Sequence, residues 1–157
     1  PGGLSTIEED RVDPYLMVSG DAGSFEWEAG LRYQHTSTTI LDETAAAADR
    51  RQERNDAALL PSLHLRRNLS ETDRLSASIA RTQRRPNFDF ITPALLEAEL
   101  GDNDLLGNPE LDPEQAWGLD LGYERRLGRE GVVGVNLFWR DIQDLVEVAS
   151  TGVEGSE

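Results

Sequence analysis

Large apolar residues alternate with polar or small residues along several stretches of the chain. The clearest case is SFEWEAGLRYQ, residues 24–34, whose apolar positions are Phe25, Trp27, Ala29, Leu31 and Tyr33. Successive side chains of a β-strand point to opposite faces, so this stretch predicts a strand with one apolar and one polar face. Similar alternation predicts strands in other parts of the chain. The full set lies near residues 14–20, 24–37, 58–68, 73–84, 114–126 and 131–141, with 144–150 as a candidate seventh.

The connections between the predicted strands alternate between short and long. Short polar links, such as SGDAGS at 19–24 and LGREG at 127–131, join alternating runs and are typical of hairpins. Neighbouring strands are therefore expected to be antiparallel and sequential, with every short turn at one end of the sheet. The predicted fold class is all-β, an antiparallel up-and-down meander. Within the long connections, Thr92, Pro93 and Gly101 predict a short helix near 93–100, and residues 42–54 predict a frayed surface helix or disorder.

Two kinds of surroundings produce such alternation. A soluble antiparallel sheet packs its apolar face on a core, whereas a strand of a membrane barrel turns that face to lipid. The aromatic residues favour lipid, because they gather at the two ends of the apolar face, as amphipathic rings do at headgroup depth. The predicted lipid-interface aromatics are Phe25, Trp27 and Tyr123 at the short-turn end, and Tyr33, Trp117 and Trp139 at the long-loop end.

The length and the second face of the strands also favour a barrel. Phe25 to Tyr33 spans about 26 Å at about 3.3 Å per residue, and a tilt of about 40° reduces this to about 20 Å, close to the apolar band of about 25 Å on outer-membrane barrels. The other face carries glycine, serine, asparagine and charges of both signs, with Leu60 and Phe138 as exceptions. Such a face suits a hydrated lumen or one filled by a polar domain.

Composition excludes several functions. The formal net charge of -15 argues against a nucleic-acid partner, which requires a basic surface. No cysteine is present, so disulfides and thiolate chemistry are absent, and His35 and His64 lack ligand-spaced neighbours. The oxygen donors Asp102, Asn103 and Asp104 are a weak calcium candidate without EF-hand spacing. Paired carboxylates on one face, such as Glu26 with Glu28 or Asp120 with Glu124, are interpreted as solvated lumen charge. No catalytic residue, metal site or cofactor is predicted, and the protein is not expected to be an enzyme.

Three stretches carry a resemblance to a known family. RTQRRPNFDF at 81–90 is followed by LLGNPELDPEQAWGLDLGYERRL at 105–127 and GVNLFWRDIQDLV at 134–146. Over about residues 75–144 this pattern resembles the late barrel region of TonB-dependent outer-membrane receptors. The family-motif residues are Arg85, Pro86, Gly107, Asn108, Pro109, Pro113 and Glu114. They are interpreted as loop-forming elements, because proline fixes backbone angles and Gly107 permits a turn closed to other residues.

The resemblance implies active uptake of a scarce ligand, such as a ferric siderophore, cobalamin or a glycan, across a bacterial outer membrane. It implies outer-membrane lipid, a plug domain and the TonB complex as partners, and it carries over no ligand-binding residue. Residues 1–157 are expected to be part of a transmembrane barrel with long extracellular loops and without the plug domain, hence a piece that cannot transport alone and that dimerises or pairs its edges when isolated. The alternative is a soluble β-sheet module whose apolar face meets a partner or its own copy, and a membrane-bound enzyme is a more distant one.

Overall fold

A computed structural model describes residues 5–42, 46, 50–92, 95–96 and 105–150. These residues form one large antiparallel sheet, a separate two-strand pair and one short helix, α1 (Phe88–Ile91). The strands of the large sheet are β1 (Ser5–Val12), β2 (Tyr15–Ala22), β3 (Phe25–Asp42), β4 (Arg51–Asn68), β5 (Asp73–Arg84), β8 (Glu114–Leu127) and β9 (Gly131–Gln143). The pair consists of β6 (Leu95–Leu96) and β7 (Leu105–Leu106).

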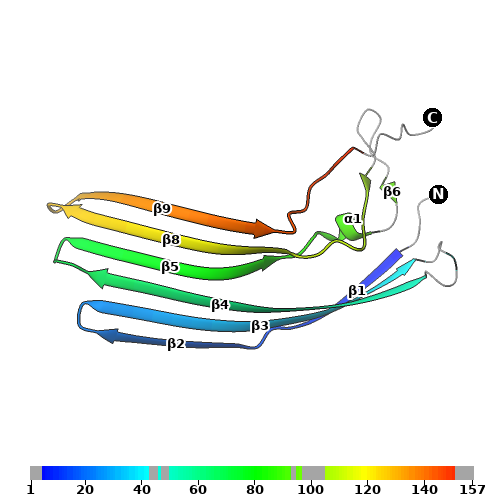
Figure 1. Cartoon of the computed structure of the whole chain (residues 1–157), viewed down its shortest axis with the longest axis horizontal. Helices are drawn as coiled ribbons and strands as arrows, with labels where there is room; N and C mark the ends of the chain where they lie inside the picture. Colours follow the sequence, from blue (N-terminus) through cyan, green and yellow to red (C-terminus); the bar gives the residue numbers. More distant parts are fainter. Residues whose placement is uncertain (1–4, 43–45, 47–49, 93–94, 97–104, 151–157) are drawn as a thin grey trace.

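The sheet is an open up-and-down meander. Its order is β1-β3-β4-β5-β8-β9, and β2 also pairs with β3 (Figure 1). The registers show that β1 and β2 lie end to end along β3, since Val12 is opposite His35 and Tyr15 is opposite Arg32. The link at Pro14 stays in the ladder, because the Tyr33 N–H donates to its carbonyl at 3.0 Å. The chain thus has one long outer strand with a single interruption.

The two ends of the sheet differ as expected from the sequence. The turns between β2 and β3, β4 and β5, and β8 and β9 are short and lie at one end, on the left of Figure 1, while the connections from β3 to β4 and from β5 to β8 start and finish at the other. Gly23 and Gly128 have φ of 66° and 64° in two of the short turns, a backbone region that side chains with a Cβ rarely adopt.

One face of the sheet is apolar, and its side chains are aligned in rows across the strands. The Phe25 row contains Phe25, Arg67, Leu75, Tyr123 and Val135; the Trp27 row contains Trp27, Leu65, Ala77, Leu121 and Leu137; the Ala29 row contains Ala29, Leu63, Ile79, Leu119 and Trp139. No second layer covers this face in the described chain: Trp27 is 37%, Leu121 45% and Leu137 64% exposed. A soluble sandwich would bury these side chains.

The buried side chains of the described residues lie elsewhere. They are Gln34, Thr36, Thr38, Ile40, Ala58 and Pro113. Half of them are polar, and those of β3 and β4 lie on the polar face at the long-loop end of the sheet. The sheet therefore has no hydrophobic core between two layers of secondary structure. No helix in the described part of the chain is long and apolar enough to cross a membrane.

Several expectations about individual segments were wrong. Residues 144–150 form no strand, because β9 ends at Gln143 and Asp144 turns the backbone with a φ of 55°. Within the segment 42–54, Arg51 to Arg54 belong to β4. Near 93–100, Leu95 and Leu96 form β6 and not a helix, and the other positions of that segment lie outside the described residues. Thr92 ends α1 instead of starting a helix: its N–H and its Oγ1 both donate to the Phe88 carbonyl, at 2.9 and 2.7 Å.

Candidate functional site

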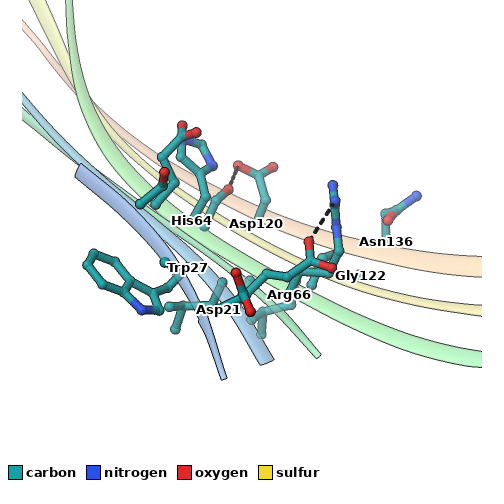
Figure 2. Close-up of a pocket in the computed structure, with 16 residues that line it drawn as sticks. Asp21, Trp27, His64, Arg66, Asp120, Gly122 and Asn136 are labelled. Atoms are coloured by element: carbon teal, nitrogen blue, oxygen red, sulfur yellow. Dashed lines mark hydrogen bonds and ion pairs between the residues drawn. The ribbon is translucent and has the colours of Figure 1, made fainter. Parts of the chain in front are cut away.

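The polar face of the sheet is hollowed toward its short-turn end. The hollow has a volume of about 680 Å³ and is lined by side chains from β2, β3, β4, β5, β8 and β9. Figure 2 shows His64, Asp120 and Asn136 on the inner side of the curved sheet and Trp27 on the opposite side. One row of the polar face crosses the hollow and contains Glu28, His64, Ser78, Asp120 and Phe138.

The charges of this hollow are only partly balanced. Arg66 pairs with Glu26 at 3.3 Å, and Arg140 pairs with Asp120 at 2.8 Å. Asp21 and Glu28 also line the hollow, and neither forms an ion pair or side-chain hydrogen bond within the described chain. The wall is therefore net negative and is suited to a polar or cationic neighbour.

Phe138 is the large apolar side chain of this polar wall. It is 76% exposed, and the Arg140 guanidinium lies 5.8 Å from the centre of its ring. An exposed aromatic ring next to the Arg140 guanidinium offers a contact surface to a molecule that enters the hollow. The expectation that Phe138 lies on the lumen face agrees with this placement.

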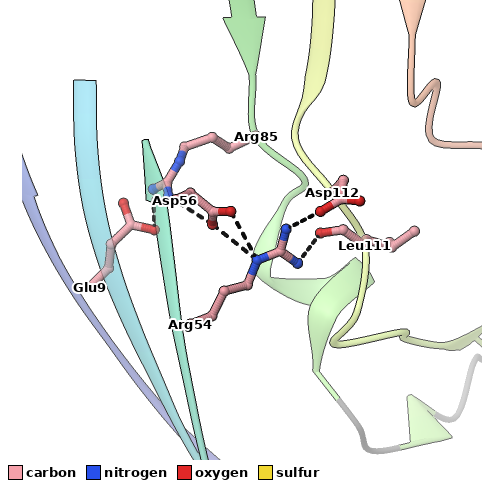
Figure 3. A network of polar contacts seen from close by, with 6 residues as sticks. All are labelled: Glu9, Arg54, Asp56, Arg85, Leu111 and Asp112. Carbon is pink, nitrogen blue, oxygen red and sulfur yellow. Dashed lines mark hydrogen bonds and ion pairs between the residues drawn. The ribbon is translucent and has the colours of Figure 1, made fainter. Parts of the chain in front are cut away.

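A second polar cluster lies at the long-loop end, where the connection from β5 to β8 meets the sheet. Figure 3 shows Arg54 from β4 and Arg85, which directly follows β5, on either side of Asp56. Arg54 Nε lies 3.0 Å from Asp56, and Arg85 lies 2.6 Å from Glu9 of β1 and 4.0 Å from Asp56. We call Glu9, Arg54, Asp56, Arg85 and Asp112 the loop clamp.

The loop clamp fastens the connection to the sheet. Arg54 donates from Nη1 to the Leu111 carbonyl and from Nη2 to the Asp112 carboxylate, both at 2.5 Å. Charge-assisted bonds from a planar guanidinium fix direction as well as distance. The segment that ends at Asp112 is thereby held against β4, and Arg85 extends the same network to β1.

The side chains of β3 next to the clamp are buried because the sheet and the connection enclose them. Thr36, opposite Asp56 and Arg11, is 2% exposed. Gln34, with its amide oriented to suit its neighbours, accepts from Arg11 and donates to Gln83 Oε1 at 3.3 Å. The hydrogen bond from Arg11 lowers the pKa of Asp13, which keeps that carboxylate ionised beside the guanidinium.

The motif residues at 107–110 form a turn that docks on α1. The Asn108 N–H donates to the Phe90 carbonyl at 2.6 Å, and the Asn108 side chain accepts from the Glu110 N–H at 3.0 Å. Gly107 is required here by close approach and not by an unusual φ. A Cβ at this position would lie 2.3 Å from the Thr92 carbonyl oxygen and 2.8 Å from that of Asp89.

The remaining motif residues lie around the same connection. Pro86 follows Arg85 of the clamp, Pro109 is part of the docked turn, and Pro113 is buried just before β8. Glu114 begins β8, accepts from the Val146 N–H at 2.9 Å and lies 3.6 Å from Arg84. The structure therefore brings the motif residues together at the long-loop end, and it adds Glu9, Arg54, Asp56 and Asp112, which the motif did not indicate.

The predicted interface aromatics lie on the apolar face. Phe25 and Tyr123 share one row, next to Trp27, and Trp117 and Tyr33 lie in successive rows toward the long-loop end. Trp139 was expected at the long-loop end as well, but it lies in the Ala29 row, between these two groups. The Tyr123 hydroxyl donates to Asp73 at 2.5 Å, so the polar tip of this ring has a partner beyond the apolar rows.

The other candidates are scattered. His35 and His64 lie on opposite faces of the sheet. Within the described residues, no cluster of three or more His, Cys, Asp or Glu side chains is arranged to hold a metal ion. Asp102, Asn103 and Asp104 lie outside the described residues.

Replacement of Gly107 by alanine should release the docked turn. The added Cβ would meet backbone atoms that cannot move aside, and overpacking of this kind costs about 1–3 kcal/mol. Cleavage of the folded protein after Glu110 by a Glu-specific protease should become at least fivefold faster. Gly118→Ala is the control, because its Cβ would meet only the flexible Arg140 side chain at 3.2 Å. Equal protection of both variants would contradict the close-packing account.

Replacement of Arg54 by glutamine should loosen the connection as well. The variant loses the ion pair with Asp56 and the two charge-assisted bonds to the connection. For the two bonds to the connection we expect about 1 kcal/mol after solvent screening, or about fivefold faster cleavage after Glu110. Arg51→Gln is the matched control, because Arg51 lies on the same strand and, within the described residues, pairs only with its neighbour Glu53, at 2.6 Å. Unchanged cleavage in Arg54→Gln would show that the clamp does not hold the loop.

Comparisons with known proteins agree with the geometry. The sequence profile of the family described as TonB dependent receptor-like, beta-barrel, matches residues 5–156. The crystal structure of the siderophore receptor PirA from Pseudomonas aeruginosa is similar in fold, with a TM-score of 0.53 and 23% identity over 89% of this chain and 33% of that chain. The chain thus spans about a third of that receptor's length. A search of curated proteins found no match. Because the family profile covers almost the whole sequence, the chain belongs to the TonB-dependent receptor family, as part of its β-barrel.

Proposed function

We propose that this chain forms an arc of the outer-membrane barrel of a receptor for TonB-dependent uptake. The observation that carries the proposal is the bare apolar face, which runs in aligned rows across β3, β4, β5, β8 and β9. Lipid is the surrounding that such a face requires when no protein layer covers it. The opposite, polar face then lines the lumen.

The orientation follows from the connections. Outer-membrane barrels have short periplasmic turns and longer extracellular loops, which places the turns at Gly23 and Gly128 on the periplasmic side and the loop clamp on the extracellular side. The connection from β5 to β8 is then an extracellular loop fastened at its base. We propose that the ligand is a ferric siderophore, cobalamin or a glycan, and that the energy reaches it through the plug domain and the TonB complex of the whole receptor.

In this proposal the chain supplies wall and loops and performs no chemical reaction. Asp21 and Glu28 give the lumen wall a negative charge that suits polar contents of the barrel. The soluble-module alternative requires a protein partner over the apolar face. The family membership favours lipid over that partner.

A charge placed on the apolar face should destabilise the receptor in a membrane. Ile79 lies on this face in the Ala29 row, and we expect Ile79→Arg to lower the free energy of unfolding by about 2–4 kcal/mol, as found near the midplane of lipid-facing barrel surfaces. The measurement is urea unfolding of the whole receptor refolded into lipid vesicles.

The neighbouring residue provides the control for this experiment. Ser78 faces the polar side beside Asp120, so Ser78→Arg should change the stability by less than about 1 kcal/mol. An Ile79→Arg variant as stable as Ser78→Arg would contradict contact with lipid and favour the soluble module.

The 157-residue chain expressed alone should self-associate in detergent-free buffer. Its sheet has open edges at β1, β2 and β9, and exposed backbone groups together with a bare apolar face promote association. Size-exclusion chromatography with light scattering should show dimers or larger species, which become fewer when detergent covers the apolar face. A single monomeric species without detergent would contradict both the open edges and the bare face.

A further inference from the structure

The apolar face has a hollow near its short-turn end, where the Phe25 row meets the Trp27 row. It has a volume of about 400 Å³, and Phe25, Leu65, Leu75, Leu121, Tyr123 and Leu137 are among its lining residues. Ala77 forms its floor, because this short side chain lies in the Trp27 row directly between Leu65 and Leu121. A hollow lined by aliphatic and aromatic side chains suits a hydrocarbon chain.

A cation stands at the rim of this hollow. Arg67 lines it and belongs to the Phe25 row, between Phe25 on β3 and Leu75 on β5. The side chain is exposed. Within the described chain no carboxylate, carbonyl or side-chain oxygen accepts a hydrogen bond from its guanidinium.

The other arginines of the apolar face differ from Arg67. Among the described residues, Arg51 pairs with Glu53, Arg81 donates to Gln115, and Arg125 lies 3.3 Å from Asp73. Arg67 is therefore the described arginine on this face whose guanidinium has no hydrogen-bond or ion-pair partner in the described part of the protein. In a membrane, a lone guanidinium at this position needs an anion or water at headgroup depth.

The depth of Arg67 fits a lipid headgroup. It shares a row with Phe25 and Tyr123, and the Tyr123 hydroxyl reaches Asp73 beyond the apolar rows. This is the level at which aromatic rings meet the interface. A phosphodiester binds a guanidinium through paired hydrogen bonds, and a chain attached to it would extend from Arg67 toward Ala77.

We propose that Arg67 and the hollow over Ala77 form a binding site for one phospholipid, with its phosphate at Arg67 and an acyl chain over Ala77. The inference rests on the proposed placement of the barrel in a membrane. It goes further, because a general lipid-facing surface has neither a cation without a protein partner nor an apolar hollow next to it. An anionic phospholipid binds there in preference to a zwitterionic one, since Arg67 adds charge attraction of the kind that basic residues exert on anionic membranes.

The test uses the whole receptor in nanodiscs of equal parts phosphatidylglycerol and phosphatidylcholine. Native mass spectrometry after transfer to detergent counts the phosphatidylglycerol molecules that stay bound. Arg67→Gln should lower this retention about fivefold, as expected for one basic residue near a membrane surface. Arg67→Lys keeps the charge without the planar fork and should retain an intermediate amount. Ala77→Leu fills the hollow while leaving Arg67 in place, and it should also lower retention.

Arg126→Gln is the matched control. Arg126 lies at the same end of the sheet on the polar face, so the variant loses the same charge without touching the hollow, and its retention should equal that of the unchanged receptor. Equal retention in Arg67→Gln and the unchanged receptor would overturn the site, and so would equal losses in Arg67→Gln and Arg126→Gln. Wild-type retention in Ala77→Leu would overturn the role of the hollow.

A measurement of membrane insertion distinguishes failure of the phospholipid site from failure of the proposed function. Co-flotation of the unchanged receptor with vesicles of the same lipids tests membrane placement alone. If the receptor co-floats with the vesicles but does not retain phosphatidylglycerol in preference to phosphatidylcholine, the phospholipid site is wrong and the barrel proposal stands. If the receptor does not float, both are wrong.

Discussion

The two-residue repeat of the β-strand is the constraint on which this structure depends. It assigns every side chain to one of two faces, and the continuous registers from β3 to β9 carry that assignment across the sheet. Trp27, Ala77 and Leu137 therefore lie in one row although they are far apart in sequence. A slip of one residue between any two strands would move apolar side chains to the polar face and polar side chains to the apolar face.

A different kind of interaction operates where the apolar rows end. At the long-loop end, β1, β3 and β4 have little apolar surface to bury. Ion pairs among Glu9, Arg54, Asp56 and Arg85 lie there next to the buried polar residues of β3. Half-buried pairs with several hydrogen bonds fix geometry more than they add stability. The loop clamp is thus suited to placing a long connection in one position at the rim of a barrel.

Sequence reasoning was sufficient where hydrophobic alternation was present. It predicted β2, β3 as far as residue 37, β4 from residue 58 onward, and β5, β8 and β9 to within a few residues. It missed β1 and the extensions of β3 and β4, because strands that are polar on both faces have no period-two hydrophobic signal. The β-branched residues Thr38, Thr39 and Ile40 were the available indication for the extension of β3.

The site was harder to predict than the fold. The motif indicated Arg85 and Gly107, but the partners of Arg85 come from strands distant in sequence: Glu9 from β1 and Asp56 from β4. Gly107 was expected to provide backbone freedom, whereas the structure uses its lack of a Cβ to let two backbone segments touch. Such contacts between remote segments leave no local pattern in a single sequence.

The outer strand formed by β1 and β2 has one further property. Pro14 accepts a hydrogen bond from the Tyr33 N–H but has no N–H to return, so the ladder to β3 lacks one rung at the level where the apolar rows end. Fraying that begins at Ser5 can stop at this gap. The amide protons of β2 then stay protected from exchange with water while those of β1 exchange through local opening. The edge of the sheet stays paired along β2 when the long-loop end moves.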